Sequence, residues 1–136
     1  MGYRLTPHTA DLGLVAWGET LEVAFAEAVR ALVAVTYDPR TLRQDEAREL
    51  RVDGDRPEQL LVRLLGEVVY LIDAQGFVTA RAGVQLGEGG LTAELRGQVA
   101  GPRRPRRRGP HVKAVTYHGL AVDPGPPARV RVVLDV

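Results

Sequence analysis

The sequence contains no cysteine and no serine among its 136 residues. The lack of cysteine excludes disulfide bonds, thiolate zinc sites and cysteine nucleophiles, and it mildly favours a cytoplasmic location. The lack of serine excludes a serine nucleophile, and no glycine-rich phosphate loop precedes an expected helix. The sequence therefore lacks the commonest nucleophilic and nucleotide-binding constellations.

Long apolar segments are missing as well. The first four residues lead into Pro7 without the apolar run of a signal peptide, and no stretch approaches the roughly 18 apolar residues of a membrane span. The formal net charge is +1, so the chain as a whole is not a strong polyanion binder. Lys113 is the only lysine, and arginine supplies the other positive charges. We expect a cytoplasmic protein with no membrane partner.

Apolar periodicity predicts two helices and several strands. Apolar residues spaced by three and four positions predict helices over 20–35, capped by Thr20, and 55–73, capped by Asp55 and ended by Gly76. Strand patterns occur at residues 3–6, 12–17, 49–52, 77–86, 91–99, 112–122 and 129–135. Because helices and strands are partly segregated, we expect an α+β fold in a single domain, 1–136, with two helices packed on a mixed, largely antiparallel sheet.

Acidic groups stand at both ends of the chain. Asp11 follows Pro7 in a predicted turn, and Asp135 precedes Val136. Alternation along the last strand puts Asp135 on the face opposite the apolar positions. If the two ends meet, two side-chain carboxylates and the carboxylate of Val136 would repel one another unless a cation lay between them. Such an all-oxygen set suits calcium or magnesium.

Simpler interpretations of the same residues stay open. An aspartate in a turn commonly bonds nearby backbone amides, and a polar residue at a strand end is commonly just exposed. His8, His111 and His118 match no structural zinc spacing, and His118 is expected to be a structural residue. General acid–base chemistry by Asp11, Asp135 and His8 is conceivable, although the sequence identifies no substrate pocket.

The densest charge lies in residues 103–108, Arg-Arg-Pro-Arg-Arg-Arg, which we call the arginine loop. Neighbouring proline and glycine residues exclude a helix and predict a mobile loop between strands. No aromatic side chain is interleaved for base stacking, but counterion release would attract a phosphate backbone to its five arginines: Arg103, Arg104, Arg106, Arg107 and Arg108. The alternative, which we prefer to specific RNA binding, is a solvated, low-complexity loop. We expect only indirect or weak contact with RNA.

Three blocks of sequence are informative together: His8-Thr9-Ala10-Asp11, Lys113-Ala114-Val115-Thr116-Tyr117-His118 and Leu134-Asp135-Val136. In this order they resemble the archease family, and the similarity covers almost the whole chain. The resemblance implies an accessory protein of the GTP-dependent RNA-splicing ligase, which promotes ligase guanylylation and multiple turnover in tRNA splicing. It also implies a divalent-cation site, with calcium seen in the family and the ligands falling on Asp11, Asp135 and Val136. Lys113 and His8 are then functional candidates near that site.

The chain departs from the family pattern at two places. The arginine loop stands where the family usually carries acidic and histidine residues, and Arg63 and Gly66 replace a typical tryptophan and asparagine. We predict a non-enzymatic activator whose partner is the RNA-splicing ligase. Two other functions stay open: a metal-dependent phosphoesterase using the same carboxylates, and an RNA-binding or chaperone-like module using the arginine loop.

Overall fold

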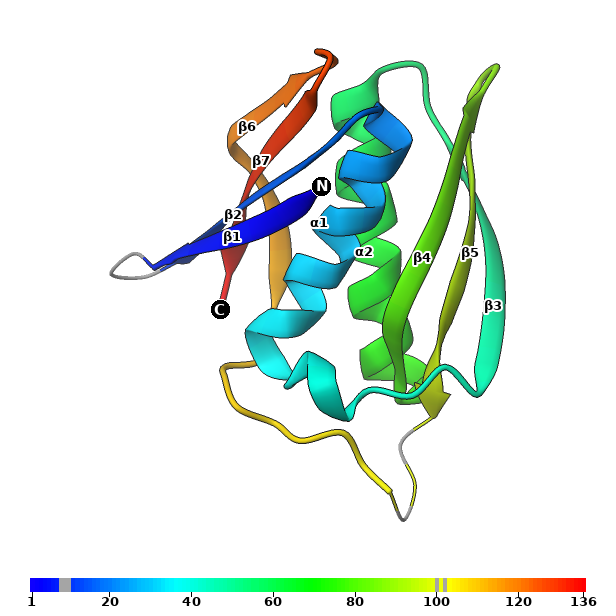
Figure 1. Cartoon of the computed structure of the whole chain (residues 1–136), viewed down its shortest axis with the longest axis vertical. Coiled ribbons are helices and arrows are strands. Elements are labelled where there is room, and N and C mark those ends of the chain that lie inside the picture. Colours follow the sequence, from blue (N-terminus) through cyan, green and yellow to red (C-terminus); the bar gives the residue numbers. More distant parts are fainter. Residues whose placement is uncertain (8–10, 100, 102) are drawn as a thin grey trace.

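The computed structural model describes residues 1–7, 11–99, 101 and 103–136. Strands and helices alternate only at the start of the chain, and the remaining strands follow the second helix (Figure 1). The elements are β1 (Gly2–Pro7), β2 (Asp11–Gly18), α1 (Leu21–Thr36), the 3-10 turn η1 (Pro39–Thr41), β3 (Glu46–Asp53), α2 (Pro57–Gln75), β4 (Phe77–Gly87), β5 (Gly90–Val99), β6 (Ala114–Asp123) and β7 (Ala128–Asp135).

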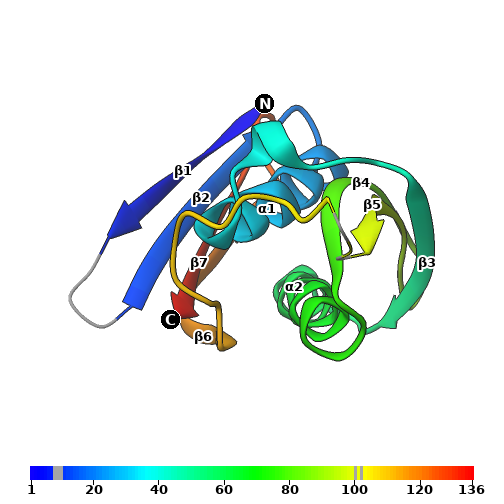
Figure 2. The ribbon, with the colours of Figure 1, turned by 90° about the horizontal axis from the view of Figure 1, so that it is seen from below.

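The strands form two antiparallel sheets with the helices between them. The first sheet has the strand order β1-β2-β7-β6, and the second has the order β3-β5-β4. Figure 2 shows α1 between β2 and β4, and α2 between β6 and the second sheet, in agreement with their contacts. The predicted α+β fold, two helices packed on a mixed, largely antiparallel sheet, is confirmed in class, but the described strands form two sheets instead of one and all their pairings are antiparallel.

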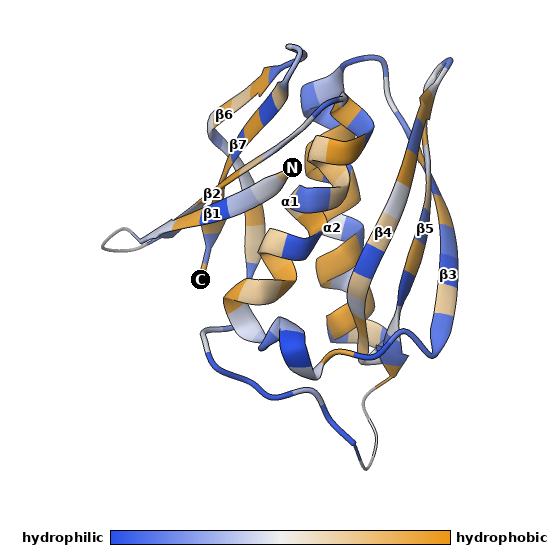
Figure 3. Ribbon diagram, in the orientation of Figure 1, coloured by the Kyte–Doolittle hydropathy of each residue, from blue (hydrophilic) through white to orange (hydrophobic). Residues whose placement is uncertain are grey.

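One apolar core joins both sheets to both helices. Phe25 of α1, Leu64 of α2, Leu134 of β7 and Phe77 of β4 are all fully buried in it. Figure 3 shows the apolar residues of both helices in the layer between the two sheets. In the described residues, no helix is both long enough and apolar enough to span a bilayer.

The two helices begin in different ways. Thr20 caps α1 as predicted, because its Oγ1 accepts a hydrogen bond from the Val23 amide at 3.2 Å. The prediction that Asp55 caps α2 is wrong, because α2 begins at Pro57 and the preceding residue, Arg56, makes no side-chain cap. A proline at the first helical position has no amide to satisfy and has its φ angle already set for a helix.

The strand β6 departs from the predicted alternation. Its pairing with β7 breaks between Thr116 and Ala121, where residues 117–120 stand opposite a single residue of β7. Tyr117 and His118 are exposed in this bulge. His118 therefore does not share a regular strand face with Thr116, and the sequence pattern did not reveal the extra residues.

Replacing glycine with alanine should have opposite effects on stability at Gly76, which follows α2, and at Gly66, which lies inside it. Gly76 ends the helix with a φ of 65°, so Gly76→Ala forces a side chain into the left-handed region and is expected to destabilise the fold by about 1–2 kcal/mol. Gly66 lies inside the helix with open space around its Cβ position, so Gly66→Ala is expected to stabilise by about 0.5–1 kcal/mol. Urea unfolding of both variants checks the signs, and the same sign for both would contradict this account of α2.

Candidate functional site

The ends of the described chain meet in the first sheet. The strands β2 and β7 are its two central strands, and their antiparallel register pairs Asp11 directly with Asp135. Side chains directly opposed in this way lie on one face with Cβ atoms about 4.5–5.5 Å apart. Asp11 is thus the first residue of β2. The prediction that it lies in the preceding turn is wrong. We call Asp11, Asp135 and Val136 the acidic corner.

The two aspartates lie on the outer face of the sheet, away from the helices. Their neighbours Leu12 and Leu134 pair with each other and belong to the core packing, so strand alternation turns the aspartates outward. Asp135 is exposed and Asp11 is partly buried. Like charges directly opposed across two strands are unfavourable, and this arrangement therefore favours a cation or a cationic partner at the acidic corner.

The main chain at the acidic corner is bonded to Lys113, which precedes β6, and to the first residue of that strand, Ala114. The Lys113 amide donates a hydrogen bond to the Asp135 carbonyl at 2.8 Å, and Ala114 pairs with Asp135. Val136 is partly buried and packs against the core. These contacts fix the last two residues beside Asp11, while the Lys113 side chain is exposed.

The donor chemistry of the acidic corner fits a hard cation. Two opposed carboxylates supply the oxygen ligands that calcium and magnesium prefer. In the part of the chain that the structure covers, no three side chains of histidine, aspartate or glutamate gather into a group that could hold a metal ion. A cation at the corner would therefore need further oxygen ligands, such as the carboxyl group of Val136.

The two described histidines, His111 and His118, lie in different parts of the fold. His8 lies outside the described residues. The Nε2 atom of His111 lies 3.3 Å from Oδ1 of Asp73, at the end of α2, and both side chains are about half exposed. This pair joins the segment before β6 to α2, whereas His118 lies in the β6 bulge. Neither placement indicates a zinc site.

A hollow of about 550 Å³ marks the outer face of the first sheet. Its lining includes Arg4, Thr6, Arg129 and Arg131. Arg131 stands four residues before Asp135 in β7, so the hollow is displaced from the acidic corner along the strand. Its basic lining also differs in charge from that corner.

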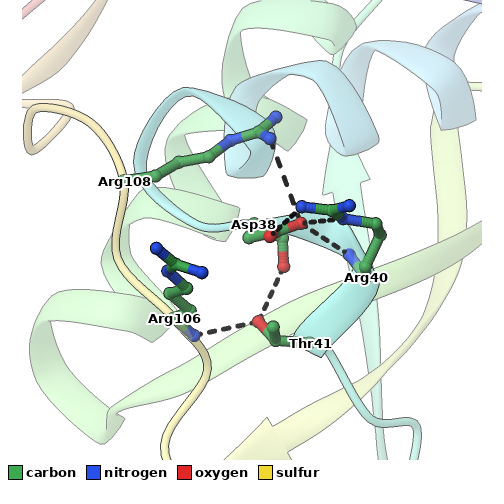
Figure 4. Close-up of polar contacts among 5 residues, drawn as sticks. All are labelled: Asp38, Arg40, Thr41, Arg106 and Arg108. Carbon is green, nitrogen blue, oxygen red and sulfur yellow. Dashed lines mark hydrogen bonds and ion pairs between the residues drawn. The ribbon is translucent and has the colours of Figure 1, made fainter.

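A second charged centre, which the sequence analysis did not identify, lies beyond the C-terminal end of α1 (Figure 4). Asp38 is only 3% exposed. Its carboxylate accepts hydrogen bonds from Nε and Nη2 of Arg40 at 3.2 and 2.9 Å and from the Arg40 amide at 3.0 Å. These bonds, chiefly the side-chain ones, lower the pKa of Asp38 from 3.8 to about 2, and Arg108 at 3.9 Å adds to the effect. The sequence signal that could have located this centre is Asp38-Pro39, because Asp38 caps η1 and Pro39 begins it.

The arginine loop is tied to this centre through its backbone. The Arg106 amide donates to Oγ1 of Thr41 at 2.9 Å, and the Arg106 carbonyl accepts from the Asp38 amide at 2.8 Å. The Arg108 amide donates to the Thr36 carbonyl at 2.8 Å. These contacts, which the sequence did not predict, attach the loop to the chain beyond α1.

Comparison with known proteins places this arrangement in a family. The sequence model of the Archease protein family matches residues 3–136. Protein archease of Pyrobaculum neutrophilum is 36% identical over 124 residues, which cover 88% of this chain and 84% of that protein. Protein archease of Pyrococcus furiosus is 34% identical over 125 residues, covering 90% and 88% of the two chains.

Solved structures agree with this match. The solution structure of protein 1598 of Methanobacterium thermoautotrophicum has a TM-score of 0.80 at 27% identity and covers 99% of both chains. The crystal structure of an archease of Thermotoga maritima, described as a possible chaperone, has a TM-score of 0.64 at 21% identity, covers 98% of this chain and 96% of that one, and shows the fold alone. The fold thus defines a class of small α+β proteins with two helices between antiparallel sheets. Within that class, this chain belongs to the Archease protein family.

The lowered pKa of Asp38 predicts a pH-dependent contribution to stability. Because the folded-state pKa lies below the ordinary value, this contribution is fully present above about pH 4 and is lost as the pH falls toward 2. The loss of unfolding free energy caused by Asp38→Asn should therefore shrink as the pH falls from 5 to 2. Urea unfolding across this range measures the difference.

The matched control for this test is Asp55→Asn. Asp55 is an exposed residue of the turn before α2, so its substitution should change the unfolding free energy by less than about 0.5 kcal/mol at every pH. If the difference in unfolding free energy between the wild type and Asp38→Asn stays constant between pH 5 and 2, the assigned role of the Asp38 carboxylate is contradicted.

Proposed function

We propose that this chain is a cytoplasmic, non-enzymatic activator of a GTP-dependent RNA-splicing ligase, and that it promotes ligase guanylylation and multiple turnover in tRNA splicing. We also propose that a divalent cation, calcium, organises the surface that contacts the ligase. Membership of the archease family supports an accessory role.

The observation that carries this proposal is the direct pairing of Asp11 with Asp135 on the outer face of the first sheet. In the proposal these two carboxylates and the carboxyl group of Val136 hold the cation. A bound cation would offset the repulsion between the carboxylates and would fix the position of the acidic corner. Calcium is preferred over magnesium because it accepts irregular and bidentate carboxylate coordination, whereas magnesium needs near-octahedral geometry.

Lys113 is the proposed ligase contact beside the cation. Its amide is bonded to the Asp135 carbonyl, and its side chain is exposed. A long cationic side chain at the edge of an acidic corner can reach a carboxylate or phosphate on a partner while its backbone stays fixed. His8 stays a candidate from the sequence, close to Asp11 along the chain.

Replacing Asp11 should remove both cation binding and ligase activation. Asp11→Asn keeps the shape of the side chain and removes one charged ligand. Calcium at a hundredfold excess over its dissociation constant should stabilise the wild-type protein by about 2.7 kcal/mol and the variant by far less. Thermal unfolding with and without calcium measures the first effect, and guanylylation of the ligase with GTP measures the second.

Asp55→Asn serves again as the matched control, because the same chemical change is made at an exposed aspartate outside the first sheet. It should keep full calcium stabilisation and full activation. Normal guanylylation with Asp11→Asn would refute the functional role of the acidic corner, and unchanged calcium stabilisation in that variant would refute its role as a ligand.

A single residue added after Val136 tests the third proposed ligand. One added glycine moves the terminal carboxylate by up to about 3.5 Å, which takes it out of the proposed coordination sphere. Calcium affinity should fall, and a glycine added before Met1 should leave it unchanged. Calorimetric titration of both extended proteins decides the matter, and equal affinities would remove Val136 from the ligand set.

A further inference from the structure

The arginine loop is held at both ends and in its middle, so its arginines start from a fixed backbone. Near its first residue, the buried Gln98 donates from Nε2 to the Arg103 carbonyl at 2.8 Å, while its Oε1 accepts from the Arg43 amide at 2.7 Å. Pro105 is buried. With the bonds of Arg106 and Arg108 described above, the loop crosses the end of the molecule from β5 toward β6 (Figure 2).

Although the backbone is held, the five arginine side chains reach solvent. Every arginine of the loop is exposed. Among the described residues, the one ion pair that any of them makes is that of Arg108 with Asp38 at 3.9 Å. Asp38 already holds Arg40 at 2.9 Å (Figure 4), so a single carboxylate serves two arginines and the loop keeps most of its positive charge.

The positive charge extends onto the adjoining segment 38–45. Together, residues 38–45 and 103–108 contain seven arginines and two aspartates, whereas the rest of the chain contains eleven basic and fifteen acidic residues. The small net charge of the protein therefore hides a separation of charge. This end of the molecule is basic, and the remainder is acidic on balance.

The chemistry of the loop matches phosphate groups better than a protein surface. A guanidinium group can donate two parallel hydrogen bonds to a phosphate. The hot spots of protein interfaces are enriched in Trp and Tyr as well as Arg, and the loop exposes no aromatic or apolar side chain to accompany its arginines, because its only non-arginine residue is the buried Pro105. Six extended residues reach up to about 20 Å, enough to follow several phosphates of one strand.

We propose that the arginine loop binds the phosphate backbone of single-stranded RNA, without reading its sequence. The lack of an aromatic side chain in residues 103–108 leaves no platform for base stacking, so binding depends on charge and salt. The choice of RNA rests on the proposed function, whereas phosphate binding itself does not. The loop leads through residues 109–113 to the Lys113 amide, which is bonded to the Asp135 carbonyl, so a short segment connects the proposed RNA site to the acidic corner.

The test compares two variants of equal charge. The loop variant carries Arg→Gln at Arg103, Arg104, Arg106, Arg107 and Arg108. The control variant carries Arg→Gln at five exposed arginines outside the basic end, namely Arg4, Arg56, Arg81, Arg129 and Arg131. Fluorescence anisotropy with a labelled single-stranded 20-nucleotide RNA, in sodium chloride from 25 to 200 mM, gives the affinity and its salt dependence.

The loop variant should lose at least about tenfold in affinity at the lowest salt, and its slope of log affinity against log salt should fall by up to about 3.5, at about 0.7 for each phosphate contact. The control variant should keep a slope within about 1 of the wild type. A variant with four of these substitutions, which keeps Arg108 and its ion pair with Asp38, should still show most of the loss in affinity. Thermal unfolding establishes that each variant is folded.

Several results would overturn the proposal. Equal losses in the loop and control variants would show that net charge alone acts, and a wild-type protein that does not bind the RNA at 25 mM salt would exclude the site. Guanylylation of the ligase without RNA is measured alongside. A large loss there with the loop variant would assign the loop to the ligase contact instead. Failure of the wild-type protein to stimulate the ligase would refute the proposed function but leave the RNA-binding result unchanged.

Discussion

The antiparallel pairing of β2 with β7 is the constraint on which the functional surface depends. These central strands bury alternate residues, among them Leu14, Val132 and Leu134, against the helices. Because the side-chain period of a strand is two, a slip of one residue in β7 would turn Arg131 and Asp135 toward the core and Val132 and Leu134 away from it. The packing therefore fixes the register, and the register in turn opposes Asp11 to Asp135. The acidic corner is a consequence of how the core is filled.

The sequence predicted what local patterns determine, and it missed what depends on pairing at a distance. Apolar spacing located both helices, and Thr20 and Gly76 marked two of their ends. The division of the strands into two sheets has no local signal, because it follows from which strands pair across the helices. The same applies to the β6 bulge, which exposes Tyr117 and His118. A period of two in the sequence cannot show where pairing with another strand breaks.

The candidate site was likewise predictable from the sequence only in part. Asp135 could be placed on an outer face by alternation, but the entry of Asp11 into β2 depended on its pairing partner in β7. The loop contacts were missed because each unites short segments far apart in sequence. The chain beyond α1 presents backbone groups that need partners, and the backbone of Arg106 and Arg108 supplies them at Asp38 and Thr36. The Arg106 amide also donates to the Thr41 hydroxyl. A run of arginines therefore indicated charge but not the attachment of the loop.

The two charged regions are linked by the short segment 109–113, whose Lys113 amide is bonded to the Asp135 carbonyl. Hydrogen bonds hold the arginine loop to the chain beyond α1, and strand pairing holds the acidic corner in the first sheet. Neither region supplies side chains to the apolar core, apart from the partial packing of Val136 and the buried Pro105. Since the core does not depend on these charged side chains, charge substitutions at either region should change binding more than folding. Activation and RNA binding can for that reason be separated by experiment within one small fold.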